Sequence, residues 1–158
     1  MAQALVEHLR FVSAQYPAEL MAIYLSDKDG YHLACAGRTD IVTPAHASTL
    51  AVTFALTAQQ TAKLGLGDCT HVLNELLFRT PSAAAAPGST AEPSAPTPAA
   101  QGADQPYTVL QLSVGPLVIL TLSAPHVAVA RVRHLLVETQ TLEAAQVVVS
   151  GMKSLRAQ

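Results

Sequence analysis

Residues 80–106 restrict the possible folds of this chain more than any other segment, because they cannot join a hydrophobic core. They hold nine Ala, six Pro and six Ser or Thr, with no Val, Ile, Leu or Phe. The prolines are spread along the segment and rule out a continuous helix, and Ala alone offers too little apolar surface to bury. We therefore predict a disordered insertion at residues 80–106, with folded sequence on both sides.

The sequence that follows the insertion is too short to fold alone. Residues 107–149 show only two strand-like runs and one helical pattern. We expect residues 1–79 and 107–149 to form a single domain, followed by a C-terminal tail at residues 150–158. An insertion at a hairpin tip is tolerated, since doubling the length of a loop adds only ~0.6 kcal/mol of closure entropy.

Hydrophobic periodicity and turn residues predict three helices and five strands. The order α-β-β-α-β-β-β-α is typical of an α/β protein of the α+β type, in which helices cover a five-stranded, mostly antiparallel sheet. The insertion then separates the third and fourth strands. Helices are expected at residues 4–16, 47–64 and 126–149, and strands at 19–26, 31–36, 70–78, 107–113 and 116–123.

Charge and composition exclude two classes of function. Nine Lys and Arg against eleven Asp and Glu give a formal net charge of −2, without a basic run that could hold a nucleic acid. No apolar run approaches the ~20 residues of a membrane helix, and Glu7 and His8 interrupt the N-terminal segment where a signal peptide is apolar. We expect neither nucleic-acid binding nor direct membrane insertion.

Three patterns suggest chemistry, and each has a simpler structural interpretation. Residues 27–30 (DKDG) begin like a calcium loop, but position twelve is Arg38 instead of Glu, which favours a hairpin turn. Residues 65–67 (GLG) follow a helix and lack the Gly-Lys-Ser/Thr of a phosphate loop. Cys69 and His71 share a strand face but have no second ligand pair. The sequence predicts no catalytic residue, metal or cofactor, and an enzyme built on Cys69 and His71 is the alternative.

The predicted helix at residues 47–64 has two faces of small or apolar residues. A helix of this kind must bury both faces, so we expect one face to cover the sheet and the other to contact a partner. In the alternative interpretation, one broad face packs inside the monomer. The first face contains Ala51, Ala55, Ala58 and Ala62, and the second contains Leu50, Phe54, Thr57, Thr61 and Leu64.

Two stretches resemble a known family: residues 23–30 (IYLSDKDG) and, more specifically, residues 48–67 (STLAVTFALTAQQTAKLGLG). Residues 116–120 (PLVIL) add weaker support. The chain resembles the roadblock/dynein light chain superfamily, and within it the mitogen-activated protein kinase scaffold subunits of the Ragulator complex. The likeness spans residues 5–78 and 107–149, while the insertion and the tail depart from the family pattern.

The resemblance implies a non-enzymatic scaffold that forms an obligate heterodimer with a second roadblock-like subunit. The long helix and the strand at residues 70–78 would form the interface and merge two sheets into one. Other implied partners are further Ragulator subunits, Rag GTPases and MAP kinase pathway kinases. The implied role is TOR signalling on the cytoplasmic side of late endosomes and lysosomes, where partners hold the chain. The expected interface residues are Leu50, Ala51, Phe54, Ala55, Ala58, Ala62, Val72 and Leu76.

Within the same superfamily, the alternative is a homodimeric GTPase regulator or a dynein-associated light chain. Mixing the chain with a different roadblock subunit separates these possibilities, because a stable homodimer favours the alternative.

Overall fold

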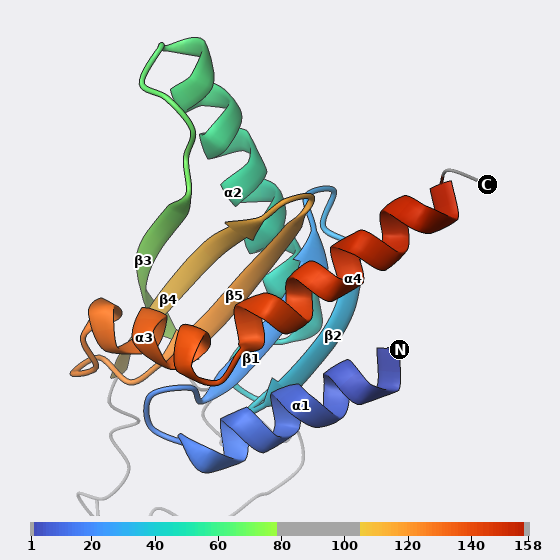
Figure 1. Ribbon diagram of the computed structural model, residues 1–158. Coiled ribbons are helices and arrows are strands. Elements are labelled where there is room, and N and C mark those ends of the chain that lie inside the picture. The colour runs from blue at the N-terminus through green and yellow to red at the C-terminus, as the bar shows by residue number, and fades with distance from the viewer. Residues whose placement is uncertain (1, 79–104, 157–158) are drawn as a thin grey trace, which may run out of the picture.

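The computed structural model describes residues 2–78 and 105–156, and it shows an α+β fold of four helices and five strands in these ranges (Figure 1). The five predicted strands and the first two predicted helices are confirmed, with ends that differ by at most three residues. The elements are α1 (Ala2–Gln15), β1 (Ala22–Asp27), β2 (His32–Gly37), α2 (Pro44–Lys63), β3 (His71–Phe78), β4 (Gln105–Val114), β5 (Leu117–Ser123), α3 (Val129–Glu138) and α4 (Thr141–Arg156).

The five strands form one sheet in the order β2-β1-β5-β4-β3, and every neighbouring pair is antiparallel. The prediction of an antiparallel α+β sheet is therefore confirmed. β3 and β4 form a hairpin whose last pair is Phe78 and Gln105, so the two ends of the intervening segment are neighbours. Gln105 and Pro106 were predicted in the insertion but lie in β4, because they pair with β3. The rest of the predicted insertion, residues 80–104, lies outside the described residues.

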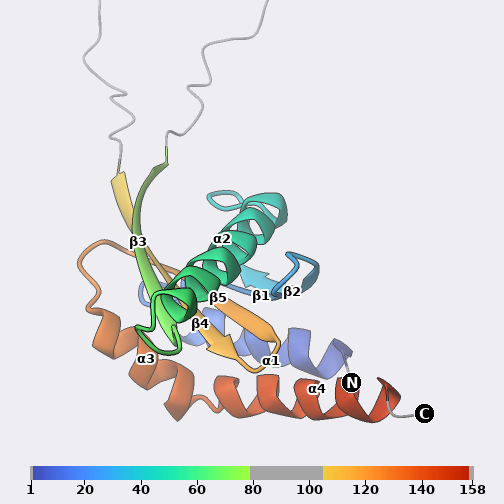
Figure 2. The ribbon, with the colours of Figure 1, turned by 90° about the horizontal axis from the view of Figure 1, so that it is seen from above.

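Helices cover the sheet on both faces. Figure 2 shows α2 on one side of the strands, with α1, α3 and α4 on the other. The strands alternate accordingly, since neighbouring side chains point to opposite faces. Ile23 and Ile119 belong to the core beneath α1, α3 and α4, whereas Tyr24 and Leu120 belong to the core on the α2 side. Among the described residues, no helix has both the length and the apolarity needed to cross a membrane.

The predicted helix at residues 126–149 is two helices in the structure. α3 ends at Glu138, and Gln140 has a positive φ of 56°, which an α-helix does not allow. The Thr139 hydroxyl donates to the Leu135 carbonyl at 2.6 Å and lies 2.8 Å from the Thr141 hydroxyl, which stabilises the break. α4 then continues to Arg156, so residues 150–156, predicted as a tail, extend this helix.

Candidate partner-binding surface

Both ends of α2 are set by local sequence. Thr43 is the N-cap: its Oγ1 accepts from the backbone N–H of His46 at 3.3 Å. In turn, Nδ1 of the His46 ring accepts from the backbone N–H of Thr43 at 3.5 Å. Pro44 follows at the first helical position, where its missing N–H has no cost. At the other end Gly65 has φ +70°, and the N–H groups of Gly65 and Leu66 donate back to the last turn at 3.1 and 3.0 Å. The two ends of α2 are therefore defined by local capping bonds and do not depend on what its faces contact.

One stripe of α2 lies in the core of its own domain. Ala47, Ala51 and Phe54 are buried, and Phe54 has 0% exposure. Ala51 and Phe54 pack with Val118 on β5, and Ala58 is partly buried against this cluster. Ala51 and Phe54 were predicted at the partner interface, but the structure places them where no partner can reach them. The reason is that Ala51 and Phe54 lie on the side of α2 that faces the sheet.

The remaining predicted helix residues lie on either side of this stripe. Leu50 is half-buried and packs against the same core cluster as Leu76 on β3. Ala55 is half-buried, and Ala62 is exposed near the C-terminal end of α2. Figure 1 shows this end of α2 reaching past the strands. The structure therefore separates the predicted Ala stripe into buried and accessible members.

A row of threonines on the outer side of α2 has its hydroxyl groups bonded within the helix. The hydroxyls of Thr49, Thr53 and Thr57 donate to the carbonyls four residues earlier, at 3.1, 2.9 and 2.9 Å. A surface whose polar groups are already bonded can be covered without leaving a donor unsatisfied. This side of α2 is therefore suited to contact with a second protein.

β3 is an edge strand with apolar side chains on both faces. Val72 and Leu76 are half-buried on the α2 side, while Leu73 and Leu77 on the other face are 47% and 67% exposed. The helices pack mainly on β1, β2 and β5 and leave β3 attached chiefly through its pairing with β4. Unpaired apolar edges readily pair with another strand. β3 and the outer side of α2 together are called the α2–β3 surface below.

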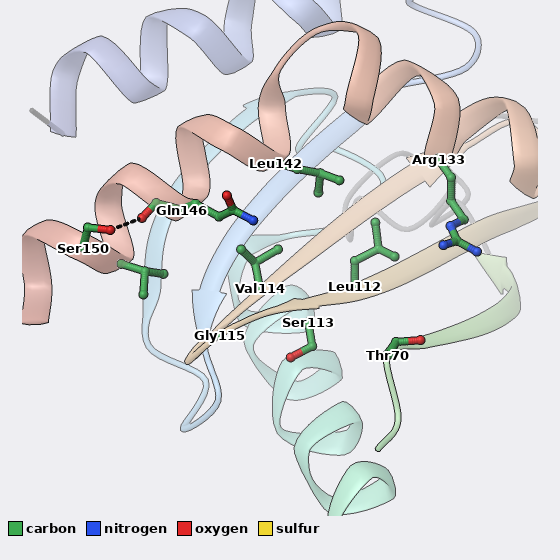
Figure 3. Close-up of a pocket in the computed structure, with 10 residues that line it drawn as sticks. Thr70, Leu112, Ser113, Val114, Gly115, Arg133, Leu142, Gln146 and Ser150 are labelled. Carbon is green, nitrogen blue, oxygen red and sulfur yellow. Dashed lines mark hydrogen bonds between the residues drawn. The ribbon is translucent and has the colours of Figure 1, made fainter. Parts of the chain in front are cut away.

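A cavity of about 530 Å³ lies on the opposite face of the sheet (Figure 3). Leu112 and Val114 of β4 form one wall, and Leu142 and Val149 of α4 form another. Arg133 of α3 extends toward the strands at one end of the cavity. The ten lining residues include no carboxylate, imidazole or thiol, so they supply no general base or nucleophilic pair.

The residues considered for chemistry adopt structural roles. The Asp27 carboxylate accepts from the backbone N–H groups of Asp29 and Tyr31 at 3.0 and 2.8 Å, as expected for a turn. Cys69 Sγ contacts the backbone carbonyl of His71 at 3.5 Å, whereas the His71 ring lies 3.1 Å from the Thr70 hydroxyl. In the described part of the chain, no three His, Cys, Asp or Glu residues are grouped to hold a metal.

A buried tyrosine and a half-buried histidine lie beneath the start of α2. The Tyr24 hydroxyl donates to the Val42 carbonyl, which holds the segment before the helix, and burial raises the pKa of Tyr24. The His32 ring lies 6.2 Å from the Tyr24 ring, and burial lowers the pKa of His32. The His32 Nδ1 is buried without a hydrogen-bond partner among the described residues. This pair was not singled out from the sequence, where a lone His and Tyr carry no recognisable spacing.

The fold is similar to those of solved structures that include a roadblock/LC7 domain. MglB of Myxococcus xanthus matches with a TM-score of 0.63 and 14% identity, over 95% of this chain and 90% of that chain. A roadblock/LC7 domain from Streptomyces avermitilis gives 0.63 and 12%, over 92% and 97%. The gliding protein MglB of Thermus thermophilus gives 0.52 and 13%, over 90% of both chains. These likenesses show the fold.

Comparison of the sequence with models of protein families also finds a match. Residues 5–75 match the model of a family described as mitogen-activated protein kinase kinase 1 interacting. A search of curated proteins finds no match. The resemblance drawn from residues 23–30 and 48–67 is therefore confirmed. The chain has a fold similar to that of a roadblock/LC7 domain, and over residues 5–75 it is similar to the mitogen-activated protein kinase kinase 1 interacting family.

Proposed function

We propose that this chain is a non-enzymatic adaptor that binds a second roadblock-fold subunit through its α2–β3 surface. The observation that carries the proposal is the edge strand β3, which has eight residues and exposes Leu73 and Leu77. Pairing with a second edge would satisfy its free backbone groups and continue the sheet into the partner. The bonded threonine row of α2 would then meet a helix of the partner above the joined strands.

The opposite edge of the sheet is less suited to this role. β2 has six residues, and both α1 and α2 pack against it. Its pairing with β1 also contains an irregularity between Leu25 and Ser26, which interrupts a regular ladder. Bulges and covering helices are common ways to prevent an edge from pairing further. The preference for β3 therefore follows from length, regularity and exposure.

We extend the proposal to a Ragulator-type assembly. The similarity of residues 5–75 to a kinase-interacting family supports a role in bringing signalling proteins together. In this proposal the chain, with other Ragulator subunits, recruits Rag GTPases and supports TOR signalling, and MAP kinase pathway kinases are further partners. It works on the cytoplasmic side of late endosomes or lysosomes and is attached there through its partners.

Affinity purification of the full chain from its own cells, followed by mass spectrometry, tests this proposal. Recovery of a second roadblock-fold subunit in equal amount supports the heterodimer, and recovery of Rag GTPases supports the Ragulator assignment. Light scattering of the purified chain measures its oligomeric state in the absence of other subunits. A stable homodimer that ignores other roadblock subunits would favour the GTPase-regulator alternative, and a monomer without a roadblock partner would contradict both.

A further inference from the structure

Gln111 is a polar side chain that is completely buried on the face of the sheet beneath α2. It lies on β4, opposite Val72 on β3 and Leu120 on β5. Its Nε2 donates to the backbone carbonyl of Leu50 on α2 at 2.6 Å, and its Oε1 accepts from Nδ2 of Asn74 on β3 at 3.0 Å. A single buried amide therefore connects the helix and the edge strand of the α2–β3 surface.

The contact with Gln111 holds the Asn74 amide at the sheet edge. An Asn side chain has two N–H donors and an acceptor oxygen, and Gln111 uses one donor. Within the described residues, the second N–H of the Asn74 amide and its Oδ1 make no hydrogen bond, and Oδ1 is not fully buried. Water can satisfy Oδ1 in the free chain, but a partner strand along β3 would displace that water.

We propose that Asn74, held in place by Gln111, selects the partner of the α2–β3 surface. The inference rests on the proposed function, because it requires a second sheet edge beside β3. A partner with an apolar side chain across from Asn74 would leave buried polar groups unsatisfied, which is unfavourable. A partner that presents Ser, Thr, Asn or Gln there satisfies them.

The residues on either side of Asn74 define the partner further. In an antiparallel pair, directly opposed residues share a face of the sheet, so Glu75 and Leu73 would each meet a neighbour of the polar residue. A basic side chain opposite Glu75 and an apolar one opposite Leu73 complement the exposed face of β3. The edge strand of a complementary partner therefore has a basic, a polar and an apolar residue at three consecutive positions, in this order from its N-terminus.

A second copy of this chain fits less well. A two-fold pairing of β3 with itself places one residue opposite its own copy. With Glu75 at this position, two carboxylates are directly opposed, which destabilises the pair. With Asn74 there, the amides can bond to each other, but Leu73 lies opposite Glu75 in both halves. The strand therefore favours a different chain, in agreement with the proposed heterodimer.

The test uses the roadblock subunit that copurifies with the wild-type chain, titrated against Asn74→Leu, Gln111→Leu and the double variant. We expect each single variant to bind at least tenfold more weakly, which corresponds to about 1.4 kcal/mol. The double variant should bind no more weakly than Asn74→Leu alone, because Gln111 acts through Asn74. Asn74→Thr keeps a hydrogen-bonding group and should stay within threefold of the wild type.

Thr121→Val is the matched control for a lost buried hydrogen bond. Thr121 is buried in β5, where its hydroxyl donates to the Leu110 carbonyl at 3.4 Å. This variant should lower the melting temperature slightly and leave the partner affinity within threefold of the wild type. If Gln111→Leu does not fold, the comparison of Asn74→Leu with Asn74→Thr decides the question.

The possible failures are distinguishable. A wild-type chain that binds a roadblock subunit while Asn74→Leu binds equally well would overturn the inference and leave the proposed function intact. Additive losses in the double variant would show that Gln111 does not act through Asn74 and would also overturn it. A wild-type chain that binds no roadblock subunit and does not self-associate would overturn both.

Discussion

Thr53 and Phe54 are neighbours on α2 with opposite environments, and substituting each in turn separates folding from assembly. Phe54 is fully buried against Ala51 and Val118, whereas Thr53 is exposed on the outer side of the helix. Phe54→Ala removes a buried ring and should cost ~3–5 kcal/mol of unfolding free energy. For a domain of this size that corresponds to a drop in melting temperature of roughly 10–20 °C.

Thr53→Arg should leave the isolated chain nearly unchanged, because Arg is a good helix former and the side chain remains in water. At an interface the guanidinium must be desolvated, at a cost of several kcal/mol. At ~1.4 kcal/mol per tenfold change, the affinity for the roadblock partner should fall more than a hundredfold. The melting temperature should stay within about 2 °C of the wild type, since surface substitutions have small effects.

Thermal unfolding followed by circular dichroism and titration with the copurified partner give the two measurements. Phe11→Arg is the control, because Phe11 is exposed on α1, on the other side of the sheet. It should change neither quantity appreciably. Wild-type affinity in Thr53→Arg would show that this side of α2 is not the interface, and a stable Phe54→Ala would show that the helix faces are assigned wrongly.

Other parts of the chain give three more expected outcomes. Deleting residues 82–103 should change the melting temperature by only a few degrees, because Phe78 and Gln105 already pair at the hairpin end; a large loss of stability would contradict this. Burial lowers the pKa of His32, so this residue binds more protons in the unfolded state than in the folded state. The free energy of unfolding should therefore decrease as the pH falls below about 6.5, and His32→Phe should show less of this decrease in chemical denaturation between about pH 7 and 5. Calorimetry with GTP, ATP and divalent metals should show no micromolar binding, and any such binding would contradict the adaptor proposal.

The helix break before α4 shows where periodicity is insufficient. Val129 to Leu136 and Leu142 to Val149 both carry apolar residues at helical spacing, and no Gly or Pro separates them. The break depends on the Thr139 and Thr141 hydroxyls and on the contact of Thr141 with His8, which lies 133 residues earlier and 3.4 Å away. A contact of that range has no local sequence signal, which is why a single helix was predicted.

The candidate surface was predictable only in part, because some of its features depend on contacts between distant segments. The importance of α2 and β3 follows from their apolar side chains, and Leu50, Val72 and Leu76 do lie at the margin between the core and the open edge. The periodicity of α2 could not show which of its two faces meets the sheet. Gln111 was missed entirely, because a polar residue within a strand is ordinarily solvent-facing, and its partners are 37 and 61 residues away.

By itself, the sequence determined the features that depend on neighbouring residues. Thr43 and Pro44 begin α2, Gly65 ends it, and Asp27 forms the turn between β1 and β2, because caps and turns need only bonds within a few residues. Apolar runs bounded by turn residues likewise located the strands. These features are local: the turn at residues 27–30 and the end of the helix near residue 64 were predicted, whereas the start of the helix was predicted three residues too late.

Only the tertiary structure decided the strand order and the orientation of α2. The sheet places β3 at an edge, buries Phe54 and leaves Thr53 outside, and brings Gln111 between Leu50 and Asn74. Each of these depends on which segments pair across long separations in the chain. Several arrangements satisfy the same local pattern, and packing of the whole core selects among them.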